Sequence, residues 1–167
     1  MGSSWRPVLL NESLIAIFSR LPYDWPVVNT DSKVPEARKV IVAVDDDFRI
    51  RESIVSLMDS AGYAPLVFAS GADLLESGSL AKADCLITDV RLPGMHGIEL
   101  QRRVRSERPD LPVIFISAFR DDEIRQRALD GGAFEFLYKP FNAAALLRTI
   151  DTLTSRHSNT TLGGEDK

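Results

Sequence analysis

The chain has 167 residues, of which 44% are hydrophobic and 26% are charged, and its net charge is −4. This is the length and composition of one globular domain with some additional residues. The acidic balance argues against a dedicated nucleic-acid surface, because such a surface needs clustered lysine and arginine. The densest basic cluster, Arg102, Arg103 and Arg105, is interpreted as the solvated face of one helix.

The single cysteine, Cys85, excludes an internal disulfide and a multi-cysteine zinc site, and its apolar surroundings predict a buried, unreactive thiol. No apolar stretch approaches the roughly 20 residues of a membrane span. No secretory cleavage site is evident after the apolar run near the N-terminus. We therefore expect a cytoplasmic protein with neither a membrane nor a nucleic acid as its partner.

Residues 1–37 precede the predicted domain and show no clear pattern of a strand and a helix. Their helical stripe of apolar residues ends at Pro22, and residues 22–35 are typical of an extended linker. Because an isolated helix of this length is marginal in water, we predict a weakly ordered extension. A helix docked on the domain or on a partner is the alternative. The stripe consists of Leu10, Leu14, Ile17, Phe18 and Leu21.

From residue 39 onward, short apolar runs alternate with segments of helical periodicity. The predicted strands are 39–44, 64–68, 84–88, 112–117 and 134–138. The predicted helices are 48–61, 70–78, 97–107, 121–131 and 141–155. Strands that each precede a helix indicate a parallel sheet with right-handed crossovers, and strands that are apolar throughout indicate helices on both sheet faces. We predict a doubly wound α/β domain at 38–157, followed by a disordered polar tail at 158–167.

Polar residues stand where these strands end. Because the carboxyl ends of parallel strands meet at one rim of the sheet, the residues that follow them should lie close together. They are Asp45 and Asp46 after the first strand, Asp89 after the third, Ser117 after the fourth and Lys139 after the fifth.

This set of side chains favours phosphoryl transfer. Carboxylates this close need a compensating cation, and a sparse all-oxygen cluster suits Mg²⁺ better than Ca²⁺. A carboxylate beside Mg²⁺ can attack a phosphoryl group, while Lys139 and Ser117 stabilise its other oxygens. The product would be an aspartyl phosphate.

Four stretches around these residues resemble the signatures of response-regulator receiver domains of two-component signalling. They are VDDDFRIRESI, LITDVRLPGMHG, VIFISA and FEFLYKPF, and the first and last look closest to the FixJ-like branch. The resemblance covers residues 38–157. It implies a flavodoxin-like receiver fold with strand order 2-1-3-4-5.

The resemblance also implies that Asp89 is the phosphorylated residue. Mg²⁺ would then be held directly by Asp46, mainly through water by Asp45, and further by Asp89 and the main-chain carbonyl of Arg91. Asp47, the third acid of the run, has no role in the family and is interpreted as the N-cap of the next helix.

For the remaining residues the resemblance implies a switch. Ser117 would be the switch hydroxyl, Lys139 the ammonium that binds phosphate, and Phe136 the switch aromatic. Ala118 would leave space for the phosphoryl group, and the bond between Lys139 and Pro140 would be cis.

The expected function is a phosphorylation-controlled switch that receives its phosphoryl group from a sensor histidine kinase or a phosphotransfer protein. It would catalyse only its own phosphorylation and dephosphorylation, so it is not expected to be a conventional enzyme. The polar residues after His157 are too few for a DNA-binding output module. We therefore expect either a stand-alone receiver that signals through contacts with a downstream protein or the receiver portion of a longer protein. A phosphorylation-dependent homodimer is one form of such contact.

Three other functions share parts of this pattern. A degenerate receiver that binds without phosphorylation would normally lack Asp46, Asp89 or Lys139; all three are present, but this remains the alternative function. A haloacid-dehalogenase-type phosphatase needs a second aspartate where Arg91 stands. A flavodoxin needs a phosphate loop rich in hydroxyls and glycine after the first strand, where three aspartates would repel FMN. His96 and His157 are expected to be exposed residues rather than metal ligands.

Overall fold

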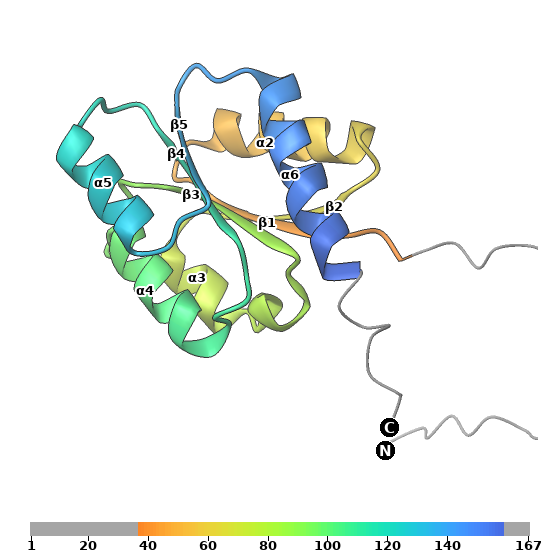
Figure 1. Cartoon of the computed structure of the whole chain (residues 1–167), viewed down its shortest axis with the longest axis horizontal. Helices are drawn as coiled ribbons and strands as arrows, with labels where there is room; N and C mark the ends of the chain where they lie inside the picture. Colours follow the sequence, from red (N-terminus) through yellow and green to blue (C-terminus); the bar gives the residue numbers. More distant parts are fainter. Residues whose placement is uncertain (1–36, 159–167) are drawn as a thin grey trace, which may run out of the picture. The chain divides into compact units, whose positions relative to one another are not determined.

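The computed structural model describes residues 37–158 (Figure 1), so nearly all of the predicted extension at 1–37 and of the predicted tail at 158–167 lies outside the described residues. Five strands and the helices between them form one α/β unit. The strands are β1 (Val40–Val44), β2 (Ala64–Phe68), β3 (Cys85–Asp89), β4 (Val113–Ser117) and β5 (Glu135–Tyr138). The helices are α2 (Phe48–Ser60), α3 (Gly71–Glu76), the short 3₁₀ helix η1 (Ser79–Lys82), α4 (Gly97–Glu107), α5 (Asp122–Asp130) and α6 (Ala143–Ser158).

The strands form a parallel sheet in the order β2-β1-β3-β4-β5. Val44 at the end of β1 is level with Phe68 on one neighbour and with Thr88 on the other. At the far side of the sheet, Ser117 is level with Tyr138. This register brings the carboxyl ends of β1, β3, β4 and β5 to one rim. The predicted doubly wound fold and its strand order are confirmed.

The sheet separates two hydrophobic cores. Helices α2 and α6 cover one face, and α3, α4 and α5 cover the other (Figure 1). Along β1, Ile41 and Ala43 enter the core beneath α2 and α6, whereas Val42 and Val44 enter the core beneath α3, α4 and α5. Because helices cover both faces of the sheet, the side chains that point to either face are buried. This explains why the strands are apolar throughout.

Side-chain caps fix where the helices begin. Asp47 accepts a hydrogen bond from the Arg49 amide at 2.8 Å, as expected for the N-cap of α2. Asp121 caps α5 in the same way, and the Asn142 side chain accepts from the Ala145 amide at 3.0 Å. The cap at Asn142 explains why α6 begins at Ala143 rather than at 141 as predicted.

Two predicted helices differ from the structure. The helix predicted at 70–78 is the shorter α3, and Gly78, with a left-handed φ of 68°, separates it from the unpredicted η1. Helix α6 extends to Ser158, three residues beyond its predicted end at 155 and one residue into the predicted tail. The other boundaries differ by one or two residues at most.

Gly97 sets the distance between α4 and the end of β3. Its amide donates to the Val90 carbonyl at 2.8 Å. A Cβ at this position would lie 2.2 Å from the carbonyl oxygen of Asp89 and 3.1 Å from the Phe115 ring. Only glycine therefore allows the helix to start this close to the strand that ends in Asp89.

We predict that Gly97→Ala lowers the free energy of unfolding by about 1–3 kcal/mol, because the added methyl group overpacks the contact with the strand backbone. Urea denaturation measures the change. Gly71→Ala is the control, since its Cβ would meet the flexible Met95 thioether at 3.3 Å and should cost much less. Equal losses in the two variants would show that the approach at Gly97 is not tight.

Candidate functional site

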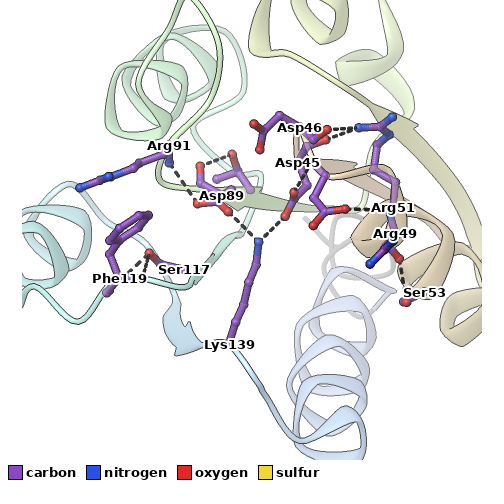
Figure 2. A network of polar contacts seen from close by, with 12 residues as sticks. Asp45, Asp46, Arg49, Arg51, Ser53, Asp89, Arg91, Ser117, Phe119 and Lys139 are labelled. Carbon is purple, nitrogen blue, oxygen red and sulfur yellow. Dashed lines mark hydrogen bonds and ion pairs between the residues drawn. The ribbon is translucent and has the colours of Figure 1, made fainter.

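Asp45, Asp46, Asp89, Ser117 and Lys139 meet at the carboxyl rim of the sheet, as predicted (Figure 2). Each stands at the end of a strand or directly after one, so the register of the sheet places them together. Asp45 and Asp89 are buried, with 3% and 8% of their surfaces exposed, and Ser117 is buried at 1%. Asp46, by contrast, is exposed.

The Lys139 ammonium connects the two buried carboxylates. Its Nζ atom lies 2.6 Å from Oδ2 of Asp45 and 2.6 Å from Oδ2 of Asp89. One cation thus compensates two carboxylates that would otherwise repel each other in a poorly solvated place. The peptide bond that follows, between Lys139 and Pro140, is cis, as the resemblance implied.

Backbone amides fix the second oxygen of each buried carboxylate. The Asp47 amide donates to Oδ1 of Asp45 at 2.9 Å, and the Arg91 amide donates to Oδ1 of Asp89 at 3.0 Å. Each carboxylate is therefore held at one oxygen by an amide and at the other by the ammonium. This arrangement orients Asp89 before any ligand arrives.

Arg51 is a part of the rim that the sequence reasoning missed. Its guanidinium donates to the carbonyl oxygens of Asp45 at 2.7 Å and of Asp46 at 2.9 Å, from the second turn of α2 (Figure 2). These bonds join α2 to the turn that carries the acids. The sequence signal is a basic residue one to two turns after the acidic run, but such a residue is too common in helices to be singled out.

Arg91 and Phe119 lie together beside Asp89. The Arg91 guanidinium carbon is 3.4 Å from the centre of the Phe119 ring, in cation–π geometry. The Phe119 amide donates to the Ser117 hydroxyl oxygen at 3.1 Å, so the loop that carries the ring is tied to the rim. Phe119 nevertheless has 46% of its surface exposed. The stack forms an outer wall next to the buried carboxylate and hydroxyl.

Phe136 is buried on the side of the sheet covered by α4 and α5. Its ring stacks on Phe115 at a centroid distance of 5.8 Å and meets the Tyr138 ring edge-on at 5.4 Å. The guanidinium of Arg120 lies 5.1 Å from the centre of the Tyr138 ring. The three rings, together with Arg120, thus connect β4 and β5 to the loop before α5. The role of Phe136 as a switch remains a prediction.

The pKa values of the rim follow from burial and pairing. Burial raises the pKa of Asp45, and its hydrogen bonds with Lys139 and with the Asp47 amide offset this only in part. Burial alone would lower the pKa of Lys139, but its hydrogen bonds with Asp45 and Asp89 raise it.

The two pKa shifts have opposite consequences for stability. Because the pKa of Asp45 is higher in the folded state, its ionised form reduces stability, and this cost disappears as pH falls through the raised pKa. The ion pairs of Lys139 stabilise the fold below the unfolded pKa of lysine and are lost as pH rises through the raised pKa of Lys139.

The predicted metal ligands are neighbours but do not form a closed set. Within residues 37–158, no group of three or more acidic, histidine or cysteine side chains is placed to hold a metal ion. Asp45 and Asp89 contact Lys139 instead, and Asp46 is exposed. The donors nevertheless fit a hard divalent cation, because they are oxygens and one carboxylate is open to solvent.

The predicted burial of Cys85 and exposure of His96 are confirmed. Cys85 is completely buried, and burial raises the pKa of its thiol to about 12, so it is unreactive. His96 is exposed. The side chain of His157 lies outside what the structure describes. In the part of the chain from 37 to 158, no helix has the length and apolar character needed to span a bilayer.

Comparison with known proteins defines the class. Residues 41–151 match the model of the response regulator receiver domain. The chain therefore belongs to the receiver-domain family of two-component response regulators. Members of this family generally use Mg²⁺ at the phosphorylation site and interact with histidine kinases or phosphotransfer proteins.

Two relatives show the extent of the similarity. The chain is 34% identical to nodulation protein W of Bradyrhizobium diazoefficiens over 119 residues, which are 71% of the chain and 52% of that protein. It is 35% identical to the transcriptional regulatory protein FixJ of Azorhizobium caulinodans over 117 residues, which are 70% of the chain and 55% of that protein. The matched region is thus about half of each relative.

Comparison with solved structures gives the same class, the receiver domain. A receiver domain protein of Clostridium thermocellum superposes with a TM-score of 0.68 at 27% identity, over 72% of the chain and 97% of that structure. The chemotaxis protein CheY4 of Vibrio cholerae superposes with a TM-score of 0.64 at 32% identity, over 70% of the chain and 99% of that structure. The similarity to both covers almost the whole of the solved domain.

The exposed Asp46 gives a test of charge crowding at the rim. We predict that Asp46→Ala raises stability in EDTA by about 0.5–1 kcal/mol, a few degrees in Tm, because it removes repulsion from Asp45 and Asp89. Calorimetry measures the shift. Glu52→Ala is the control, since Glu52 is also exposed but lies within α2 rather than in the acidic run at the rim. If both variants gain equally, overall charge rather than the rim is responsible.

Proposed function

We propose that this receiver domain is a phosphorylation-controlled switch in which Asp89 accepts a phosphoryl group from a sensor histidine kinase or a phosphotransfer protein. The observation that carries the proposal is the contact of Lys139 with both Asp89 and Asp45. It places a cationic side chain at the carboxylate that would react, next to an acidic side chain that can bind a metal.

The transfer itself is a displacement at phosphorus. An oxygen of the Asp89 carboxylate attacks the phosphorus of the donor and forms a new P–O bond. The bond from phosphorus to the donor atom breaks, its electron pair stays with that atom, and an acyl phosphate remains on Asp89. With acetyl phosphate as the donor, the leaving group is acetate.

Two side chains of the rim would then change partners. Lys139 leaves the Asp89 carboxylate for a phosphoryl oxygen, keeping Asp45 as its second partner. Ser117 gives up its 3.4 Å contact with the Phe119 carbonyl and donates its hydroxyl to another phosphoryl oxygen. Mg²⁺, held by Asp46, Asp45, Asp89 and the Arg91 carbonyl, would neutralise phosphoryl charge.

The signal would pass from Ser117 to Phe136 through β4 and β5. Phe115, two residues before Ser117 on β4, is level with Phe136 on β5 and stacks on it. We propose that phosphorylation stabilises one position of Phe136 in this stack and that a downstream protein, or a second copy of the chain, reads the resulting surface. The domain would catalyse only its own phosphorylation and dephosphorylation.

We predict that acetyl phosphate with Mg²⁺ adds one acid-labile phosphate to the protein, and that Asp89→Asn or EDTA abolishes the addition. Intact mass spectrometry measures it. Asp47→Asn is the control, because it removes a neighbouring acid while asparagine still caps α2. A degenerate receiver would stay unlabelled in every sample, and unchanged labelling of Asp89→Asn would place the phosphate elsewhere.

The Arg91–Phe119 stack should slow hydrolysis of the acyl phosphate by obstructing the approach of water. Phe119→Ala should lower the barrier by about 0.5–1 kcal/mol, roughly a two- to fivefold shorter half-life. Loss of label over time measures it. Phe134→Ala is the control, since that ring is equally exposed at 45% but precedes β5, at the opposite end of the sheet from Asp89. A half-life that is unchanged or longer would remove the steric argument.

A further inference from the structure

A groove between α4 and α5 has no part in the mechanism described above. Its volume is about 620 Å³. It is lined from His96, the N-cap of α4, to Arg105 on that helix, and by Arg127 of α5 and its C-cap Gly131. The two helices lie side by side on the same face of the sheet (Figure 1). Its position, charge and construction indicate a binding surface.

Arginine dominates the charge of the groove. Arg102, Arg105 and Arg127 line it together with one acid, Glu99. Hydrogen bonds from Arg102, and then from Arg103, lower the pKa of Glu99 to about 2, so this carboxylate is already engaged by two guanidinium groups.

The other two arginines of the groove have no acidic partner. Within residues 37–158, neither Arg105 nor Arg127 forms an ion pair. Arg105 donates only to the neutral carbonyl of Gly132, at 3.2 Å. A protein with a net charge of −4 therefore carries an uncompensated positive groove.

Gln101 holds the two walls of the groove together. It is 2% exposed, and its side-chain amide donates to the Ala128 carbonyl at 2.9 Å, which ties α4 to α5. Gly131 allows this close approach, because a Cβ there would lie 2.9 Å from the Gln101 oxygen. With the partly buried Ile98 beside it, the groove has a preformed floor between its arginines.

The size and lining of the groove select its occupant. The lined part of α4 is about 14 Å long at roughly 1.5 Å per residue, which matches an extended peptide of about four residues. Arginine forks bind carboxylates in a bidentate manner. The lining contains no Phe, Tyr or Trp on which a nucleotide base could stack.

We propose that the α4–α5 groove docks an acidic segment of a partner protein, with its carboxylates on Arg105 and Arg127 and its apolar side chains over Ile98 and Gln101. Charge complementarity supplies the selectivity, and the preformed floor limits the entropy lost on binding. The proposed contacts involve none of the residues of the rim around Asp89.

The test uses the full chain and a short fluorescein-labelled peptide with alternating Glu and Leu, followed by fluorescence anisotropy. The groove variant is Arg105→Gln with Arg127→Gln. The matched control is Arg125→Gln with Arg148→Gln, which removes the same charge from exposed residues of α5 and α6 outside the groove. We expect the groove variant to bind at least about tenfold more weakly and the control to change by less than about twofold.

Further measurements test whether the peptide binds in the groove and whether the variants are folded. Amide chemical shifts of the wild type should move in α4 and α5 on addition of the peptide, and a peptide with Gln in place of Glu should not bind. Labelling of Asp89 by acetyl phosphate should be the same in both variants, which shows that they are folded and separates this test from that of the proposed function. Equal weakening in both variants, shifts outside the groove, or stronger competition by pyrophosphate or a single-stranded oligonucleotide would overturn the proposal.

Discussion

The contact of one ammonium with two buried carboxylates determines how the rim of this domain is built. Asp45 and Asp89 come from neighbouring strands and are almost completely buried, so the two carboxylates would repel each other without a cation between them. Lys139 supplies that cation from the end of β5, two strands away from β3 in the sheet. The contact requires the strand order and register that are observed, because only they bring these three strand ends to one point. The fold and the candidate site are therefore consequences of the same sheet.

Much of this arrangement could be predicted from the sequence, because it follows from periodicity. Uniformly apolar runs that alternate with helix-period segments determine a parallel sheet, and a parallel sheet determines which residues meet at its rim. Asp47 could be assigned as a helix cap for the same kind of local reason. The chemistry of the rim could be argued from its carboxylates, hydroxyl and ammonium, whereas the particular role of each residue rests on the family resemblance.

Other features depend on distances that no sequence pattern contains. The contact of Arg51 with the carbonyls of Asp45 and Asp46 depends on how α2 is rotated, and the tie from Gln101 to the Ala128 carbonyl depends on how closely α4 and α5 pack. The three acids were expected to surround a metal. In the structure Lys139 lies between two of them, because an ammonium within reach of buried carboxylates pairs with them. Gly78 was correctly read as a helix end, but the helical turn that resumes after it was not foreseen.

The separation of the two hydrophobic cores has a mechanical consequence. Phe136 belongs to the core beneath α3, α4 and α5, whereas the next residue, Leu137, packs against the core beneath α2 and α6. A sideways displacement of the Phe136 ring therefore compresses or loosens only one of the two layers, and the well-packed sheet between them acts as a rigid partition. The opposite layer keeps its shape while the first one changes. One small domain can in this way present a constant surface to one partner and a variable surface to another.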